Sequence, residues 1–259
     1  PRWKNIQKSI RSKTLSDVCE ELNLKIYDEN HKKIKNPKIL IAGCGTGQQS
    51  IEAAARYKNC NVIAVDISSS SLAYAKRKSE EFGFNNIRYM QADILDLKKI
   101  DLKFDLIHCS GVLHHMDKPL MGLKVLCDIL NPNGLIKLGY YSELARKNIV
   151  RIRNEIQKSG ITSDRESIIK FRDSLIKSEA KHHMEVFKYA DFYSVSAIRD
   201  MLFHVEEKRF SLPQISMDLD SCGLKFCGFD EKNIIDNFTS IYGSKDGLYN
   251  LDKWNSYEQ

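Results

Sequence analysis

Three glycines at alternating positions, Gly43, Gly45 and Gly47, have the spacing in this chain that points most clearly to chemistry. They follow the apolar run of residues 39–42, which is typical of a strand buried on both faces of a parallel sheet. Glycine lets the backbone adopt positive φ angles and approach a ligand closely. Helix-forming residues begin near Gln48, and the first N–H groups of a helix have no partner inside it. The pattern therefore predicts a nucleotide-like ligand in this turn.

The spacing of the glycines argues against a dinucleotide. The Gly-x-Gly-x-x-Gly pattern of dinucleotide sites would require glycine at position 48, where the chain has Gln48. The third glycine, Gly47, comes one residue too early. A nicotinamide-dependent dehydrogenase is therefore disfavoured.

Acidic or small residues follow three further predicted strands. Asp66 ends the apolar run at residues 61–66. A carboxylate there can accept two hydrogen bonds from a ribose diol, or it can serve only as a helix cap. Asp93 follows the next strand, and Ser110 ends the fourth at residues 104–110. Because the carboxyl ends of parallel strands share one edge of the sheet, we expect these residues to lie together.

The elements that position these residues alternate between strands and helices. This alternation indicates a Rossmann-like, doubly wound, mostly parallel α/β sheet with right-handed crossovers. An N-terminal helical leader precedes the sheet, and a helical cap is inserted after strand five. The strands are expected at residues 39–42, 61–66, 86–90, 104–110 and 135–139, the last after a turn at 131–134.

Five segments are expected along the chain. The leader packs as a lid or extends over the surface, and the cap covers the active site. The return to the core includes a sixth strand at residues 224–229, and no seventh strand is found in the polar C-terminal extension. The segments are the leader at 1–36, the cofactor-binding core at 37–140, the cap at 141–210, the return at 211–230 and the extension at 231–259.

Two helices are expected at the start of the cap. The first spans residues 143–158, and the second opens with a capping box whose first residue is Ser163.

Composition narrows the function classes. The chain has 259 residues and a net charge of +6, and its Lys and Arg residues are scattered, which disfavours a nucleic-acid partner. No apolar run approaches the roughly 20 residues that span a bilayer. The seven cysteines show no Cys-x-x-Cys spacing, so we expect reduced thiols in a cytoplasmic protein, without disulfides and without a metal site.

Residues 37–140 resemble the class I S-adenosylmethionine-dependent methyltransferases, in particular the type 11/12-like methyltransferase domains. The resemblance rests on the Gly-x-Gly-x-Gly turn, on Asp66, on the pair Asp93-Ile94 and on the Leu-His-His turn before a helix at Pro119. Residues 141–146 and 192–205 resemble a bacterial subgroup whose domain is often fused to tetratricopeptide repeats, although no repeats are visible in this chain.

The resemblance implies S-adenosylmethionine as the cofactor, held at the carboxyl ends of the strands. The residues that match the family's cofactor positions are Ala42, Gly43, Cys44, Gly45, Gly47, Gln48, Asp66, Ile67, Ala92, Asp93, Ile94, Ser110 and Gly111.

Ile41 departs from the family pattern, because the family usually has an acid at this position that helps to anchor the methionine amino group. Its absence leaves that role to the backbone near Ala42 and Ser110 or to a residue of the cap. Weaker cofactor binding and a catalytically silent homologue are the other interpretations.

Candidate residues for the chemistry beyond the cofactor lie after strand four and in the cap. His114 and His115 occupy a turn that faces the ligand, where each either takes part in catalysis or makes a structural hydrogen bond. His182 and His183 are expected at the surface or at a hinge. The candidate catalytic residues are His114, His115 and Tyr141, and the candidate substrate residues are Glu143, Tyr193, Arg199 and His204.

Three functions remain open. The leading hypothesis is a methyltransferase that acts on a small molecule, because the cap is large. The alternatives are a protein methyltransferase and a cofactor-binding module without catalysis. Ser110-Gly111-Val112-Leu113 stands where enzymes that methylate bases or amides carry Asn/Asp-Pro-Pro-Tyr/Phe, which disfavours those substrates.

Overall fold

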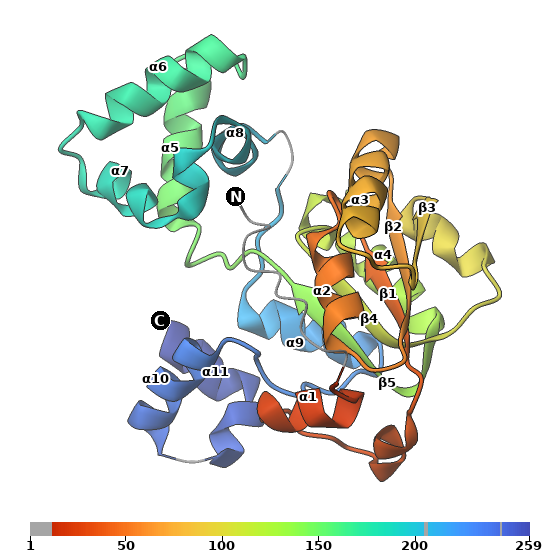
Figure 1. The fold of residues 1–259 in the computed structure, drawn as a ribbon. Helices are drawn as coiled ribbons and strands as arrows, with labels where there is room; N and C mark the ends of the chain where they lie inside the picture. The colour runs from red at the N-terminus through yellow and green to blue at the C-terminus, as the bar shows by residue number, and fades with distance from the viewer. Residues whose placement is uncertain (1–11, 205–206, 244) are drawn as a thin grey trace. The chain divides into compact units, whose positions relative to one another are not determined.

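The computed structural model of the chain describes residues 12–204, 207–243 and 245–259. It divides into two compact units, which are drawn in Figure 1. Unit 1 is Pro1–Tyr140 together with Leu212–Gln259, and unit 2 is Tyr141–Ser211. Residues 1–11 of the predicted leader lie outside the described residues. That unit 2 acts as a cap stays a prediction.

Unit 1 is built on a five-stranded, fully parallel sheet with the order β3-β2-β1-β4-β5 (Figure 1). The strand order reverses at β1 and β4, which is where sheets of this kind bind ligands. The predicted Rossmann-like fold is confirmed. The strands are β1 Lys38–Ala42, β2 Asn61–Asp66, β3 Ile87–Gln91, β4 Phe104–Ser110 and β5 Leu130–Gly139.

The buried strand β1 divides the core of unit 1 into two apolar clusters. Ile39 and Ile41 belong to the cluster that contains side chains of the first three helices, and Leu40 and Ala42 belong to the cluster that contains those of α4. All four residues have no measurable exposure. The run therefore reads as continuously apolar because both faces of the strand are covered. The helices are α1 Leu15–Glu21, α2 Gln48–Arg56, α3 Ser69–Glu81 and α4 Pro119–Asp128, with 3₁₀ turns η2 Glu29–Lys33, η3 Ile94–Lys99 and η4 Leu113–His115.

The start of α1 shows the capping chemistry that fixes the leader. The Asp17 N–H donates to the Thr14 hydroxyl at 3.1 Å, and the Thr14 N–H donates to the Asp17 carboxylate at 2.7 Å. These reciprocal bonds satisfy two backbone donors at the helix start.

Strand β5 begins earlier than predicted. Phe104 pairs with Leu130 and Leu106 pairs with Leu135, so the expected turn at residues 131–134 is a bulge inside the strand. Asn133 takes a left-handed conformation there, with φ of 63°.

The sixth strand predicted at residues 224–229 is wrong. This segment has neither helix nor strand, and its Phe226 and Phe229 pack instead with Phe238 and Trp254 of the C-terminal helices. The apolar alternation thus reflects packing against helices rather than pairing in a sheet. The elements of this region are α9 Leu212–Ser221, α10 Lys232–Tyr242, η7 Lys245–Tyr249 and α11 Leu251–Glu258.

Unit 2 is a small helical body with an apolar core of its own. Its core joins Ile149, Ile152, Ile168, Phe192 and Ile198, each of which is at most 1% exposed. The elements are α5 Lys147–Lys158, α6 Arg165–Ile176, α7 Lys181–Glu185, η5 Val186–Lys188, η6 Ala190–Tyr193 and α8 Val195–Phe203.

Two helix starts in unit 2 differ from the prediction. Helix α5 begins at Lys147 rather than at 143, because residues 142–146 form a turn in which the Ala145 N–H donates to the Ser142 hydroxyl. Helix α6 is capped by Asp164, whose carboxylate accepts the N–H groups of the second and third helical residues at 3.0 Å. The expected capping box from Ser163 is therefore wrong by one residue.

A short parallel bridge joins the two ends of unit 2. Ser142 pairs with Phe210. The Phe210 N–H donates to the Tyr141 carbonyl at 2.9 Å, and the Glu143 N–H donates to the Phe210 carbonyl at 3.1 Å. The chain therefore enters and leaves this unit at one place.

A buried ion cluster holds α5 against the segment after α8. The Glu207 side chain is fully buried and accepts hydrogen bonds from Arg146 and from Arg153, the latter at 2.9 Å. The Arg146 guanidinium also stacks on the Tyr141 ring, 3.8 Å from its centroid. Burial is tolerated here because the charges are paired and hydrogen-bonded.

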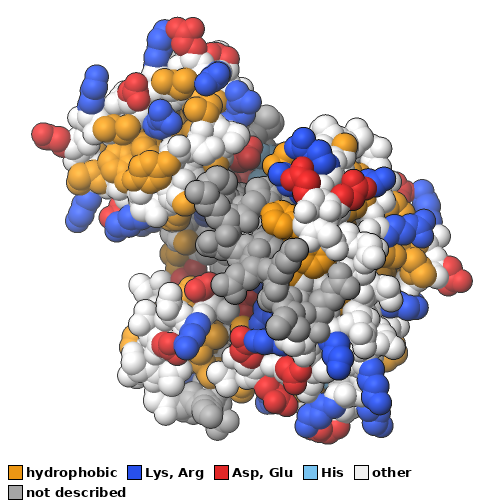
Figure 2. Space-filling model, in the orientation of Figure 1, with side chains coloured by type: hydrophobic (Ala, Val, Ile, Leu, Met, Phe, Trp, Pro, Cys, Tyr) orange, Lys and Arg blue, Asp and Glu red, His pale blue; other side chains and the backbone are white. Residues whose placement is uncertain are grey.

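Among the described residues, no helix combines the length and apolar composition needed to cross a bilayer. On the face drawn in Figure 2, basic and acidic side chains are interspersed rather than gathered by sign.

We expect Glu207→Gln to lower the free energy of unfolding by about 3–5 kcal/mol, because two partly or fully buried guanidinium groups lose their counter-charge. The measurement is urea denaturation followed by circular dichroism. The matched control is Glu166→Gln, which removes an exposed carboxylate paired with Lys170 and should cost less than about 1 kcal/mol. Equal losses in the two variants would contradict the prediction.

Candidate functional site

The glycine turn lies between β1 and α2, at the carboxyl edge of the sheet. Gly43, Gly45 and Gly47 have φ angles of 74°, 51° and 89°, a region that side chains disfavour. The N–H groups of Gly43 and Cys44 both donate to the Val65 carbonyl at 2.8 Å. The turn is thus fixed to the neighbouring strand β2.

The three glycines meet different surroundings. A Cβ on Gly43 would lie 2.2 Å from the Val112 side chain, and a Cβ on Gly47 would lie 2.6 Å from Ala75. A Cβ on Gly45 would meet no atom within 4 Å. Gly43 and Gly47 are therefore required for packing, whereas Gly45 borders open space in which a ligand can approach the backbone.

Asp66 connects the end of β2 to this turn. One carboxylate oxygen accepts the Gly45 N–H at 2.7 Å, and the other accepts the Ser68 N–H at 2.9 Å. Each carboxylate oxygen has further acceptor capacity, which is what a ribose diol needs. Asp66 therefore does bond to backbone N–H groups, as the capping interpretation expected, and these bonds also hold its carboxylate in place.

The residue after Asp66 is an exposed apolar side chain. Ile67 is 69% exposed at the edge of the sheet, and its carbonyl accepts a hydrogen bond from the Gln91 side chain at 3.0 Å. An exposed isoleucine at this position provides apolar surface for a planar ring. The sequence analysis did not predict a role for Gln91 at this site. The signal that could have found it is its position at the end of β3, next to the end of β2.

The acidic loop after β3 contributes Ala92, Asp93 and Ile94. The Ala92 N–H donates to the Asp66 carbonyl at 3.2 Å, which brings this loop beside β2. Asp93 caps η3 and accepts the Leu95 N–H at 2.8 Å. Ile94 is 7% exposed and belongs to the core, so less of its surface faces a ligand than that of Ile67.

The end of β4 holds Ser110 and Gly111 beside a histidine that was not predicted. The Ser110 hydroxyl lies 3.1 Å from Nε2 of His108, and the Gly111 N–H donates to the Gly139 carbonyl at 3.3 Å. Burial, with a smaller effect of the Lys137 ammonium, lowers the pKa of His108 to about 4. The signal in the sequence was the two-residue spacing, which puts His108 and Ser110 on one face of the strand.

The remaining cofactor positions belong to the framework of the turn. Ala42 is fully buried at the end of β1. Burial, assisted by the nearby Asp66, raises the pKa of the Cys44 thiol to about 12. Gln48 begins α2, and its side chain donates to Glu52 at 2.9 Å.

Ile41, the departure from the family pattern, is fully buried in the apolar cluster of α1, α2 and α3. Because the residues around Ile41 are apolar, they suit isoleucine. A carboxylate at this position would be buried without a polar partner from that cluster.

His114 and His115 lie in η4, directly after β4. His114 is 1% exposed, and its ring contacts the His115 ring edge-on, with centroids 4.3 Å apart. His115 is partly exposed and is thus the more accessible of the two. Their catalytic role stays a prediction.

Tyr141 and the four candidate substrate residues belong to unit 2. Burial raises the pKa of Tyr141, so its hydroxyl keeps its proton at neutral pH. Glu143 and Arg199 are exposed, and Tyr193 is 70% exposed with its hydroxyl donating to the Phe187 carbonyl. Among the substrate candidates, His204 lines a cavity of unit 2, whereas the other three are not among its lining residues.

The residues gathered at this edge of unit 1 fit the adenosine part of S-adenosylmethionine. The open backbone at Gly45, the fixed carboxylate of Asp66 and the exposed surface of Ile67 meet the needs of a backbone approach, a ribose diol and an adenine ring.

Comparisons with known proteins agree with this geometry. The profile of a family described as "Methyltransferase domain" matches residues 33–191. An uncharacterized protein of Synechococcus sp. is 26% identical over 241 residues, which cover 87% of this chain and 57% of that protein. The ubiquinone biosynthesis O-methyltransferase of Coxiella burnetii is 34% identical over 108 residues, which cover 42% of this chain and 45% of the enzyme.

The structure of PKMT2 from Rickettsia typhi has a similar fold. Its TM-score is 0.62 at 20% identity, and the match covers 86% of this chain and 46% of that one. PKMT2 is also known in complex with AdoHcy, with a TM-score of 0.62 at 18% identity. The chain thus spans about half the length of the relatives it matches.

We expect Gly45→Ala to weaken S-adenosylmethionine binding by at least about tenfold, because the methyl group enters the open space at the turn. The matched control is Gly83→Ala after α3, where φ is 75° and the added Cβ also meets no atom within 4 Å. Both variants should lose about 1–2 kcal/mol of stability from the left-handed backbone. Calorimetric titration separates them, and equal affinities would contradict the assignment of the turn.

His108 should make stability depend on pH. Above about pH 6.5 its imidazole is neutral in both the folded and the unfolded chain, so it adds no pH dependence. Between about pH 6.5 and pH 4 only the unfolded chain takes up the proton, and the free energy of unfolding falls by about 3 kcal/mol in total. Urea denaturation across this range should show a shallower decline in His108→Gln. Parallel profiles would contradict the prediction.

Proposed function

The chain belongs to the methyltransferase domain family, whose class I members use S-adenosylmethionine, and we propose that it transfers a methyl group to a small anionic acceptor. The observation that carries the transfer reaction is the convergence of Gly45, Asp66 and Ser110 at the carboxyl edge of one parallel sheet. The acceptor class is inferred from a cavity in unit 2.

The proposed role of unit 1 is to bind and orient the cofactor. S-adenosylmethionine supplies a methyl group on a sulfonium, which is already an activated electrophile. Gly45 admits the ligand to the backbone, Asp66 accepts from the ribose, and Ile67 with Asp93 borders the adenine. Positioning of this kind, together with exclusion of water, is the main contribution that a protein makes to such a transfer.

Neither Tyr141 nor His108 is an effective general base at neutral pH. The pKa of Tyr141 is raised by burial, which makes this hydroxyl a poor base at neutral pH. His108 is neutral at that pH, and its ring orients the Ser110 hydroxyl by a hydrogen bond. An acceptor whose nucleophilic atom is already negatively charged needs little help from a general base, so an anionic acceptor is compatible with these two weak bases.

The cavity in unit 2 has the size and charge for such an acceptor. Its volume is about 480 Å³, within the range of small-molecule sites. Arg153, His204 and Arg209 line it, and its described lining residues include no acid. Glu207 offsets part of the charge of Arg153 and lies 3.9 Å from Arg209. Among the described residues, the cavity therefore has more guanidinium groups than carboxylates, which favours a carboxylate or phosphate group.

The experiment incubates the protein with methyl-labelled S-adenosylmethionine and cell extract, then separates anionic small molecules from protein. We expect label in the small-molecule fraction. Label in the protein fraction alone would overturn the acceptor class in favour of a protein substrate. Failure of calorimetric titration to detect cofactor binding would overturn the methyltransferase itself.

Once the acceptor is isolated, we expect Arg209→Ala to raise its KM by about tenfold with unchanged cofactor affinity, because one charge of the cavity is lost. The matched control is Arg165→Ala, which removes an exposed arginine of α6 that does not line the cavity and should leave KM unchanged. An equal KM in the two variants would contradict the assignment of the cavity.

A further inference from the structure

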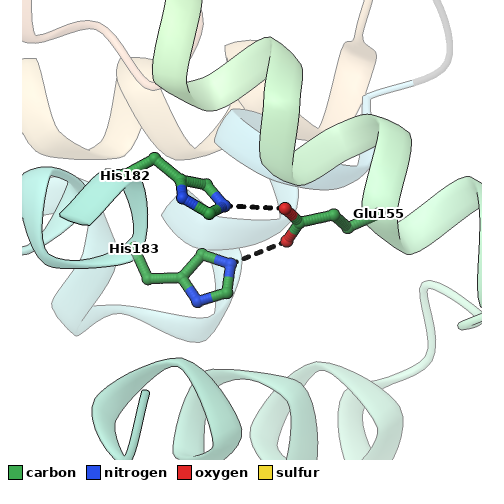
Figure 3. A group of neighbouring side chains, drawn as sticks. All are labelled: Glu155, His182 and His183. Atoms are coloured by element: carbon green, nitrogen blue, oxygen red, sulfur yellow. Dashed lines mark hydrogen bonds and ion pairs between the residues drawn. The ribbon is translucent and has the colours of Figure 1, made fainter. Parts of the chain in front are cut away.

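We propose that Glu155, His182 and His183 form a binding site for a divalent transition metal of the zinc class within unit 2. Figure 3 shows the two imidazole rings pointing toward the Glu155 carboxylate, with the histidines on α7 and the glutamate on α5. This site is separate from the cavity, since none of its three residues lines it.

The three donor atoms have the convergence that a metal requires. Nε2 of His182 lies 2.6 Å from one oxygen of Glu155, and Nε2 of His183 lies 2.6 Å from the other. One donor atom from each residue falls within 4.8 Å of the other two. Donors around tetrahedral zinc lie roughly 3.3 Å apart, so admitting the ion requires the two N···O distances to lengthen to about this value.

The chemistry of the donors selects the class of metal. Two imidazole nitrogens and one carboxylate oxygen make the set found at zinc sites that keep a fourth position for water. Magnesium and calcium prefer all-oxygen ligands, so this set disfavours them.

A neighbouring hydroxyl orients one of the ligands. Oγ of Ser178 lies 2.7 Å from Nδ1 of His183, so the ring can donate this proton and direct the lone pair of Nε2 to an ion. Outer contacts of this kind fix the tautomer and ring position of metal-binding histidines.

Burial distinguishes the site from a chance surface grouping. His182 is 8% exposed, so the expectation of a surface position is wrong for this residue. The side chain of His183 is 15% exposed, and that of Glu155 is 36% exposed, which leaves a route from solvent. Without metal, each imidazole donates Nε2–H to the carboxylate, and the trio acts only as a clasp between α5 and α7.

The experiment titrates Zn²⁺ into the metal-free full chain by calorimetry and records the visible spectrum with Co²⁺ as a probe. We expect one site per chain, a raised Tm and the absorption bands of four-coordinate Co²⁺. Mg²⁺ should give none of these signals. Absence of Zn²⁺ binding, or a six-coordinate Co²⁺ spectrum, would overturn the proposal.

Variants assign the binding to these residues. We expect Ser178→Ala to weaken Zn²⁺ binding by about tenfold, and Glu155→Gln or His182→Gln to weaken it further. The control is His115→Gln, which changes one member of the other His-His pair in the sequence and should bind Zn²⁺ as the wild type does. Circular dichroism checks that each variant folds. If His182→Gln does not fold, Glu155→Gln still tests the site, because glutamine has nearly the same shape as glutamate. Wild-type affinity in a folded Glu155→Gln or Ser178→Ala variant would overturn the assignment.

Discussion

The attachment of the glycine turn to β2 is the constraint on which the ligand-binding edge of unit 1 depends. Two N–H groups of the turn share the Val65 carbonyl, and a third is held by the Asp66 carboxylate. The turn and the acid are therefore held together, and the carboxylate that fixes the backbone is also the one proposed to accept from the ribose. A site arranged in this way spends little free energy on ordering when a ligand binds. The positive φ angles of the glycines are what this close approach requires.

Much of unit 1 could be predicted from the sequence because its signals are local. Strand β1 is continuously apolar because both its faces are covered. Helices α1 and α3 each begin after a capping residue, Thr14 or Ser68, that is visible in the sequence. Where the predictions were wrong, a local pattern served another purpose. The apolar residues of 224–229 pack on helices. Helix α6 is capped by Asp164 rather than by Ser163, because the Asp164 carboxylate accepts two N–H groups.

The features that were not predicted join residues far apart in the chain. Glu207 lies more than fifty positions from Arg146 and Arg153, which donate to it, and Glu155 contacts two histidines from another helix. Neither spacing carries a periodic signal that sequence patterns can reveal. His108 is different, because its place two residues before Ser110 was visible. Its neutrality, however, follows from burial, which only the folded structure defines.

The pairing of Ser142 with Phe210 bears on how new specificities arise on this fold. Since the two ends of unit 2 meet, the entropy of closing the chain between β5 and α9 changes little with the length of what is inserted. We therefore expect changes of length between these two ends to leave the register of the sheet unchanged. In the proposed division of roles, selection for a different acceptor would act on the inserted helices, while the glycine turn and its acid would stay constrained by the cofactor.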